Sequence, residues 1–465
     1  MKNEVLNYFK KISSIPRPSG HEEKIADYLV SFAKEHNFEY YRDNSNNVII
    51  KKPTNVSGND KTLILQSHTD MVCEKNDRTD FDFFTQGIKL KFEDDFIMAD
   101  GTTLGADNGV GVAMILALLS DPKVEHPNIE AVFTSEEETT MGGAQRLDYS
   151  KIKGKHLLSL DGADEGNVEI SSAGFLELYC EYPVKFVEDT KTAYEVKITG
   201  LMGGHSGEQI HTPRLNAIKA LVEAITPIKN KKLCNINCNS KINAIPREAG
   251  VVFVTDDSYT KENIEDIVEA YKTTHNDFEK ELEFSVNIVT VNNYIDSETT
   301  DNLLAFINNY KNAVLEYDTT DPNFPITSCN LANIKIEDNL VKFRISVRSS
   351  KKTSEKFYTD KIIELATKHN IKSQIVDTNP FYERKENPYL TLICANAYEK
   401  LYNKKSVVKG IHAGLEGGIF SQNIPDIEIC TIAPNIYNLH SPLERASLSS
   451  IDRTYEWVKQ ILKDF

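Results

Sequence analysis

Five short stretches of the chain carry side chains that can ligate divalent metals or transfer protons. In chain order, "SHTD", "GADNG", "SEEE", "LDG" and "NLHSP" contain His68, Asp70, Asp107, Glu136, Glu137, Asp161 and His440. Imidazole and carboxylate groups are the protein ligands of zinc and related cations. Two imidazoles and five carboxylates are enough to hold two cations and to leave one carboxylate as a base. These residue types therefore favour a hydrolase with two metal ions.

Each stretch alone has a simpler explanation. Asp107 at the start of a helix is a natural cap, and Asp161 before Gly162 suits a turn. Three consecutive acids usually form a solvated surface, and a lone histidine is more often a satisfied polar residue than a ligand. Five unrelated coincidences in one chain are less economical than a single site, so the ordered series favours metal chemistry.

The elements expected to position these residues are strands that end at them. "KTLILQS", "EAVFTS" and "HLLSL" are strand-like and run directly into His68, Glu136 and Asp161. Ligands at the ends of neighbouring strands are typical of an α/β sheet. "NGVGVAMILALLS", after Asp107, predicts a buried helix whose glycines allow close packing. Because neighbouring side chains diverge in extended backbone, Glu136 and Glu137 are expected to face different partners.

Composition excludes several classes of partner. The chain has 465 residues, which predicts two or more domains, and 69 acidic against 53 basic residues give a net charge of −16. Such a charge disfavours nucleic acid and anionic membranes, and no apolar run is long enough for a bilayer. The N-terminus has no signal-peptide pattern and seven Cys form no disulfide framework, so a cytoplasmic location is expected.

The pattern of expected strands and helices changes near residue 190, which predicts an inserted domain. A strand, helix, strand order occurs at about residues 238–291 and recurs at about 329–377, which suggests a duplication. We therefore expect a discontinuous α/β catalytic domain, residues 1–190 and 381–465, with a mixed central sheet flanked by helices. Residues 191–380 are expected to form a two-lobed α+β lid, because His440 must return to the site of His68.

The stretches quoted above, together with "GGHSGEQIH", "NAIPREA", "IHAGLEGGIF" and "HSPLERASL", closely resemble the Xaa-His dipeptidase family. This family, also called peptidase D or cytosol non-specific dipeptidase, belongs to the zinc aminoacylase/carboxypeptidase superfamily. The resemblance runs from about Pro16 to the C-terminus. It implies hydrolysis of small peptides by a water that two divalent cations activate, with zinc expected first and manganese or cobalt as alternatives.

The resemblance also implies a role for each site residue. The implied metal ligands are His68 and Asp161 for one ion, His440 and Glu137 for the other, and Asp107 between both. The implied catalytic groups are Glu136 as general base, Asp70 behind His68, and the lid residue His205 as stabiliser of the oxyanion. The implied substrate contacts are Asn330, Arg348, His412 and Glu416, with Arg348 assigned to the C-terminal carboxylate.

Some alternatives stay open. Glu138 extends the acidic run where this family more usually has Ala or Gly, so the register of base and ligand is open, although the spacing from Ser135 favours Glu136 as base. His205 acts either within its own chain or across a homodimer, as in shorter-lid relatives. Rival functions are another exopeptidase or an aminoacylase of the superfamily, and a non-enzymatic metal-binding protein, which would not need the base.

Overall fold

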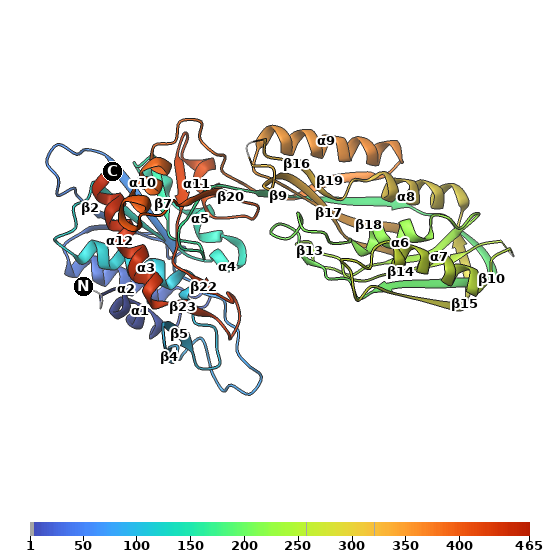
Figure 1. Ribbon diagram of the computed structural model, residues 1–465, viewed down its shortest axis with the longest axis horizontal. Coiled ribbons are helices and arrows are strands. Elements are labelled where there is room, and N and C mark those ends of the chain that lie inside the picture. The colour runs from blue at the N-terminus through green and yellow to red at the C-terminus, as the bar shows by residue number, and fades with distance from the viewer. Residues whose placement is uncertain (1–3, 257, 320) are drawn as a thin grey trace. The chain divides into compact units, whose positions relative to one another are not determined.

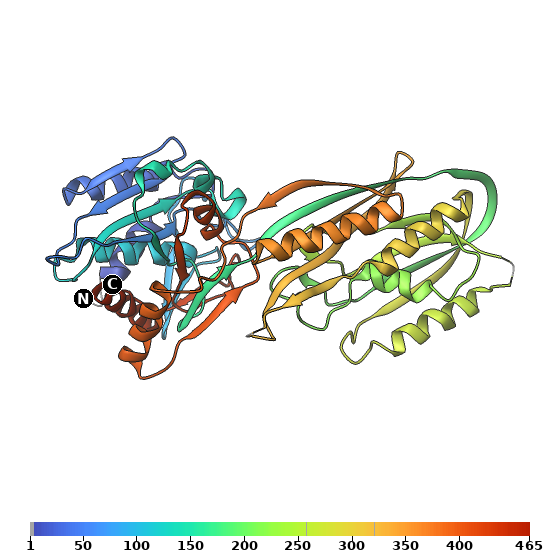
Figure 2. The ribbon, with the colours of Figure 1, turned by 90° about the horizontal axis from the view of Figure 1, so that it is seen from above.

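The computed structural model describes residues 4–256, 258–319 and 321–465, and the chain divides into two compact units (Figures 1 and 2). Unit 1 is Met1–Ser172, Tyr382–Ile411 and Leu415–Phe465, and unit 2 is Ala173–Phe381 and His412–Gly414. The second unit thus begins before the expected boundary at residue 190. The reason is strand β9 (Gly174–Pro183), which pairs with β18 (Leu340–Ser349) and β19 (Lys372–Asn379) of unit 2.

Unit 1 is built on an eight-stranded mixed sheet, as expected. Its strand order is β1-β2-β6-β3-β7-β21-β8-β20. The central strands β6, β3, β7 and β21 are parallel, whereas β1, β2 and β8 add antiparallel pairs. The bounds in sheet order are Glu39–Arg42, Val48–Lys52, Asn128–Thr134, Thr62–His68, His156–Ser159, Glu428–Thr431, Asn167–Ser172 and Val407–Ile411.

Both faces of this sheet are covered by apolar side chains. In β2, Val48 and Ile50 join one buried cluster while Ile49, which points the other way, joins another. The helices of the first cluster are α1 (Glu4–Ser13), α2 (Glu23–Glu35), α3 (Ala106–Ser120), α10 (Leu390–Tyr402) and α12 (Leu448–Asp464). The second cluster lies under α5 (Gly142–Arg146) and α11 (Gly417–Asn423).

Helix α3 is buried nearly all round, as its sequence predicts. A Cβ at Gly109 would lie 2.6 Å from Nη2 of Arg17, and one at Gly111 would lie 2.7 Å from Oγ of Ser67. The two glycines therefore allow the close packing that was expected of them.

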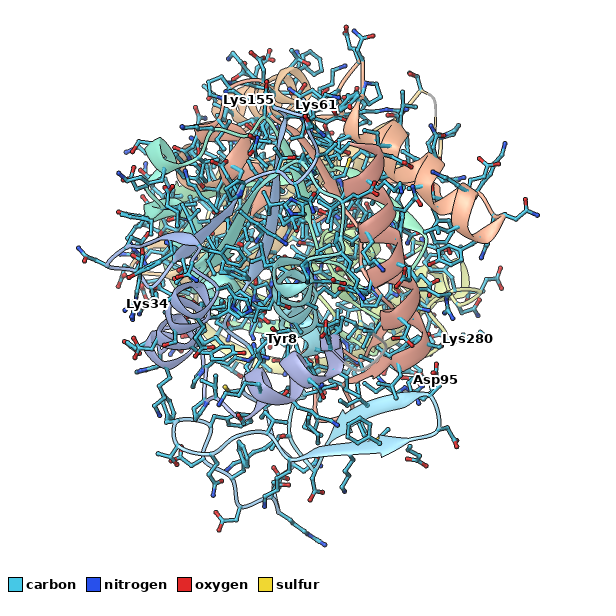
Figure 3. All side chains as sticks on the ribbon, turned by 90° about the vertical axis from the view of Figure 1, so that its left-hand side faces the viewer. Tyr8, Lys34, Lys61, Asp95, Lys155 and Lys280 are labelled. Atoms are coloured by element: carbon cyan, nitrogen blue, oxygen red, sulfur yellow. The ribbon has the colours of Figure 1, made fainter. Side chains whose placement is uncertain are left out.

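Unit 1 also contains a small antiparallel sheet, β22-β23-β5-β4. Its strands are Ile436–Tyr437, Arg445–Ser447, Phe96–Ala99 and Leu90–Glu93. Asp95, labelled in Figure 3, lies in the β4–β5 turn and accepts a hydrogen bond of 2.9 Å from the backbone N–H of Ser449 in α12. This bond fixes the small sheet to the first turn of the C-terminal helix.

Unit 2 contains two sheets with one topology. The first sheet, β12-β14-β10-β15, comes from the chain order β10-α6-β12-β14-α7-β15. The second, β17-β18-β9-β19 with β16 added at its edge, comes from β9 and then α8-β16-β17-β18-α9-β19. Apart from β16, both are βαββαβ units with their strands in the same order.

The bounds of these elements complete the description of unit 2. In the first half they are Phe186–Thr199 (β10), Ala217–Ile225 (α6), Lys232–Asn237 (β12), Ala249–Val254 (β14), Lys261–Thr273 (α7) and Glu283–Ile295 (β15). In the second half they are Ser297–Asn309 (α8), Ala313–Tyr317 (β16), Pro325–Glu337 (β17) and Lys352–Lys368 (α9). A two-stranded ribbon joins β11 (Gly204–His205) to β13 (Ala244–Ile245).

Candidate metal centre

The candidate ligands lie where the central strands end. His68 is the last residue of β3, Asp161 follows β7 by two residues, and the acidic run begins two residues after β6. Because β6, β3 and β7 are parallel neighbours, their carboxyl ends meet at one edge of the sheet. Asp107 is the second residue of α3, and His440 lies in the loop between β22 and β23.

Asp107 lies between the two histidines. The Nε2 atom of His68 is 3.2 Å from its Oδ1, and the Nε2 atom of His440 is 3.2 Å from its Oδ2. Each imidazole therefore contacts a different oxygen of one carboxylate, which is the arrangement of a carboxylate that bridges two ligand groups. Asp161 joins the His68 side, with its Oδ1 3.4 Å from Nε2 of His68.

The third acid of the run, Glu138, joins the His440 side. Its Oε2 is 3.1 Å from Nε2 of His440, and its side chain is only 5% exposed. Donor atoms of His68, Asp107 and Glu138 lie within 4.8 Å of one another and could hold a metal ion. The ligand expected on this side was Glu137, whereas the carboxylate that contacts His440 is that of Glu138.

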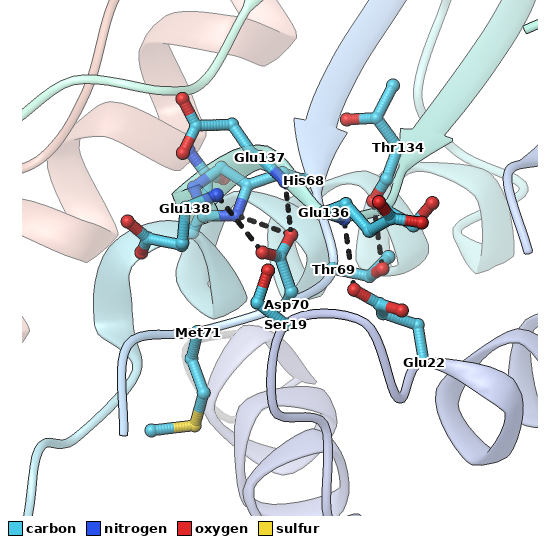
Figure 4. Close-up of polar contacts among 12 residues, drawn as sticks. Ser19, Glu22, His68, Thr69, Asp70, Met71, Thr134, Glu136, Glu137 and Glu138 are labelled. Carbon is cyan, nitrogen blue, oxygen red and sulfur yellow. Dashed lines mark hydrogen bonds and ion pairs between the residues drawn. The ribbon is translucent and has the colours of Figure 1, made fainter. Parts of the chain in front are cut away.

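Glu136 lies outside the group. Its Oε1 pairs with Nη2 of Arg146 at 2.5 Å, and Figure 4 shows its side chain beside Thr134, on the other side of Asp70 from those of Glu137 and Glu138. The expected extended backbone is absent here, because Glu136 has a left-handed φ of 54° and α4 (Glu137–Thr140) begins directly after it. The turn redirects the side chains, so the role expected for Glu136 as the base is not supported by its position.

Glu137 faces the His68 side of the group. Burial raises the pKa of its carboxyl well above the usual value; His68 opposes this rise, whereas the negative charges of Asp161 and Glu416 add to it. Glu416 is fully buried and accepts hydrogen bonds from Nε2 of Gln66 (2.7 Å) and Oγ1 of Thr134 (2.6 Å). Burial raises the pKa of Glu416 to about 8.

Carboxylates also hold the backbone of the acidic run. Asp70 accepts the N–H of Glu137 and of Glu138, each at 3.1 Å, and its Oδ1 lies 3.4 Å from Nδ1 of His68. Glu22 accepts the N–H of Glu136 at 2.9 Å. Asp70 thus contacts the histidine that it was expected to orient and fixes the adjacent turn as well. The Glu22 contact was not anticipated, because nothing in the local sequence relates it to the run.

The acids around the two histidines raise the pKa of each imidazole. Burial disfavours the charge on His68, but Asp161, Asp107 and Asp70 raise its pKa well above 6.5. Hydrogen bonds to Asp107 and Glu138 raise the pKa of His440 to about 10. Two imidazoles and three carboxylates suit zinc, manganese or cobalt, and a bound cation would displace the two imidazolium protons.

The remaining predicted residues lie in unit 2. The Nε2 atom of His412 is 2.8 Å from Oγ of Ser328, and a Cβ at Gly207 would lie 3.1 Å from the His205 ring and 3.2 Å from Nε of Arg348. Because Gly207 is close to both side chains, His205 and Arg348 lie near each other. The side-chain amide of Asn330 forms hydrogen bonds within the unit: it donates to Ala244 O at 2.9 Å and accepts from Asn216 at 3.0 Å.

Arg348 is a buried cation that forms no ion pair with the residues whose positions are described, although the charge of Glu208 acts on it. It is 7% exposed, its guanidinium stacks 5.2 Å from the Phe175 ring centroid, and Nε has no hydrogen-bond partner within the described ranges. Burial lowers its pKa to about 10. Burial and the charge of Arg348 also lower the pKa of His205, and lower that of His412 to about 3. Both histidines are therefore neutral near pH 7.

Comparison with known proteins places the chain in a family. The model of "Peptidase family M20/M25/M40" matches residues 64–464. The chain therefore belongs to this family of hydrolases, which confirms the resemblance seen in the sequence. Across the part of the chain that the structure describes, none of the helices is long and apolar enough to traverse a bilayer.

Individual relatives support the same assignment. The cytosol non-specific dipeptidase of Escherichia coli is 31% identical over 472 residues, which is 98% of this chain and 96% of that protein. The crystal structure of an aminoacylhistidine dipeptidase from Vibrio alginolyticus has a TM-score of 0.91 at 30% identity and covers 99% of this chain and 96% of its own. Aminopeptidase PepT from Bacillus cereus, at 15% identity and a TM-score of 0.59 over 100% of this chain and 98% of its own, shares the fold.

Proposed function

We propose that this protein is a dipeptidase of broad specificity that hydrolyses Xaa-His and similar dipeptides with two divalent cations. The observation that carries the proposal is Asp107, whose two carboxylate oxygens each contact a different histidine. The names of the two relatives that match nearly the whole chain support a dipeptide substrate. The name of the Escherichia coli relative also supports a cytosolic location, in keeping with seven free cysteines.

The cations would be held by five residues of unit 1. His68 and Asp161 would hold one ion, His440 and Glu138 would hold the other, and Asp107 would contact both. We propose zinc first, with manganese or cobalt as alternatives. When bound, such ions lower the pKa of a coordinated water and polarise the carbonyl of the peptide bond.

We propose Glu137 as the general base, in place of Glu136. Its backbone is fixed by Asp70, and no hydrogen bond or ion pair engages its carboxylate among the residues whose positions are described. A free carboxylate at this position can accept a proton from the attacking water and return it to the departing amine. Glu136, in contrast, is paired with Arg146.

Unit 2 is proposed to supply contacts to the substrate. A buried guanidinium without a paired carboxylate is costly unless an anion binds it, so Arg348 is suited to the C-terminal carboxylate of a peptide. The neutral imidazole of His205 is suited to donate a hydrogen bond to a developing oxyanion.

Mixing His205→Ala chains with Glu137→Gln chains tests whether His205 acts in a homodimer. Activity recovered in the mixture means that His205 acts across subunits, and no recovery means that it acts within one chain.

The proposal is tested with metal-free protein. Dipeptides, tripeptides and N-acylated amino acids are assayed before and after addition of zinc, manganese or cobalt, and bound metal is counted by elemental analysis. We expect two ions per chain and turnover of dipeptides with a free amino terminus. Faster hydrolysis of N-acylated amino acids would instead identify an aminoacylase, and two bound ions without any turnover would identify a metal-binding protein.

A further inference from the structure

Glu444 connects two parts of the candidate metal centre that are far apart in the sequence, the start of α3 and the loop that carries His440. Its buried carboxylate, 2% exposed, accepts four backbone hydrogen bonds at the start of α3. Oε2 accepts from Leu104 N at 2.7 Å and from Gly105 N at 2.9 Å, and Oε1 accepts from Ala106 N at 2.8 Å and from Asp107 N at 3.2 Å. The helix has no cap from its own N-terminal side chain, because that position is Gly105. A residue far along the chain therefore supplies the acceptors.

The same loop carries His440. Between His440 and Glu444 the chain forms a compact turn, in which Ser441 Oγ donates to Asn438 O at 2.8 Å and Glu444 N donates to Ser441 O at 3.0 Å. Both ends of this turn reach Asp107: His440 contacts its carboxylate, and Glu444 binds its backbone N–H, each at 3.2 Å. The position of His440 relative to Asp107 thus depends on one short turn and its anchor.

We infer that Glu444 is a positioning residue that sets the geometry between His440 and Asp107, and with it the affinity of the cation proposed on the His440 side. This inference rests on the proposed two-cation function. Hydrogen bonds from backbone N–H groups to a carboxylate are strong because the acceptor is charged. Ligands that are fixed in this way keep their geometry without the ion, and loss of such supports typically costs 10–100-fold in metal affinity.

The chain offers a matched control in Glu428. This glutamate of β21 is 6% exposed and binds the start of α10 in the same manner. Its carboxylate accepts from Tyr389 N (2.9 Å), Leu390 N (2.8 Å) and Thr391 N (2.9 Å), and from Thr391 Oγ1 (3.0 Å). None of these residues is a candidate ligand, so Glu428→Gln disturbs a similar helix cap without touching the metal centre.

The experiment compares the wild type, Glu444→Gln and Glu428→Gln, each titrated with zinc under a metal buffer. We expect both variants to melt at a lower temperature than the wild type. We expect Glu444→Gln to keep one tightly bound zinc and to need at least a tenfold higher free zinc concentration for the second. Its kcat should fall at low free zinc and recover in excess zinc with KM little changed, whereas Glu428→Gln should bind two ions as tightly as the wild type.

Two results would overturn the inference. Wild-type affinity for both ions in Glu444→Gln would show that the carboxylate does not set the ligand geometry. Equal loss of the second ion in both variants would assign the effect to general destabilisation. If Glu444→Gln does not fold, the shorter Glu444→Asp, which keeps the charge, is expected to show a smaller loss of the same ion. A wild type that binds fewer than two ions would instead refute the two-cation function itself.

Discussion

Glu136, Glu137 and Glu138 are consecutive residues with three different environments. Glu136 pairs with Arg146 and is 27% exposed, Glu137 lies among buried carboxylates, and Glu138 contacts His440. The left-handed backbone at Glu136 and the helical turn that follows separate these directions. Three chemically identical side chains can therefore be distinguished only by their local backbone.

A first prediction separates the base from its neighbour. Glu137→Gln should lower kcat by about 10²–10⁴-fold, the usual contribution of a general base, and should keep both metal ions. Glu136→Gln is the matched control and should keep most of the activity, because it loses only a partly exposed pair with Arg146. Steady-state kinetics and elemental analysis check both variants. Loss of turnover in Glu136→Gln with full metal content would instead identify Glu136 as the base, as the sequence first suggested.

A second prediction concerns Glu138. Glu138→Gln should release one of the two ions on dialysis, because a neutral amide replaces an anionic ligand beside His440. Glu137→Gln, dialysed in parallel, should not. Metal content measured by plasma spectrometry decides between them, and two ions retained by Glu138→Gln would argue that its carboxylate is not a ligand.

At the scale of elements, the turn after β6 is held tightly against the strand end. Gly143, in α5, donates its N–H to Ser135 O at 3.1 Å, and a Cβ there would lie 2.1 Å from that oxygen and 2.6 Å from Ser135 N. Both are backbone atoms that cannot rotate away. Glycine therefore allows the close approach that sets the path of the acidic run.

A third prediction follows from this approach. Gly143→Ala should destabilise unit 1 by about 1–3 kcal/mol or more, since overpacking of this kind forces the backbone to shift, and should weaken metal binding through Glu138. Gly162→Ala is a milder comparison, because its added Cβ would meet side-chain atoms of Ala433 and Thr431 at 3.1 and 3.4 Å. Urea unfolding and zinc titration measure both effects; equal stability of the two variants would contradict the argument.

At the scale of the whole molecule, the two units shift the pKa values of their histidines in opposite directions. In unit 1 an excess of carboxylates raises the pKa of His68 and His440. In unit 2 burial and the charge of Arg348 lower the pKa of His205 and His412. The charges of unit 1 therefore favour cations, whereas the charge of Arg348 in unit 2 favours an anionic group.

A fourth prediction uses His412. Because its pKa is about 3 in the folded unit and near 6.5 when unfolded, the unfolded chain binds more protons between these values. The stability that depends on neutral His412 is complete above pH 6.5 and is lost as pH falls, at up to about 1.4 kcal/mol per pH unit. Hydrogen exchange in β17 and β18 between pH 7.5 and 5 should show this slope in the wild type and a shallower one in His412→Gln. Parallel slopes would contradict it.

Much of the fold follows from local pattern. The sequence predicted the apolar strands that end at His68 and Asp161, the buried helix after Asp107 and the mixed sheet. These elements can be predicted because the spacing of apolar residues along the chain indicates which side chains are buried. The strand, helix, strand order of both halves of unit 2 is visible in the same way. The boundary at Ala173 was not, because β9 differs from a strand of unit 1 only in the distant strands with which it pairs.

That His68, Asp107, Asp161 and His440 would lie together could be predicted from their residue types and their order in the chain. Which carboxylate contacts which histidine depended on three-dimensional structure. Glu136 has a left-handed backbone, and the residue that contacts His440 is Glu138, one position after the expected Glu137. The anchor at Glu444 was equally hidden, because its partners at Leu104–Asp107 lie more than 300 residues away. Side-chain direction and long-range contact arise only when the chain has folded, so local sequence carries no direct record of either.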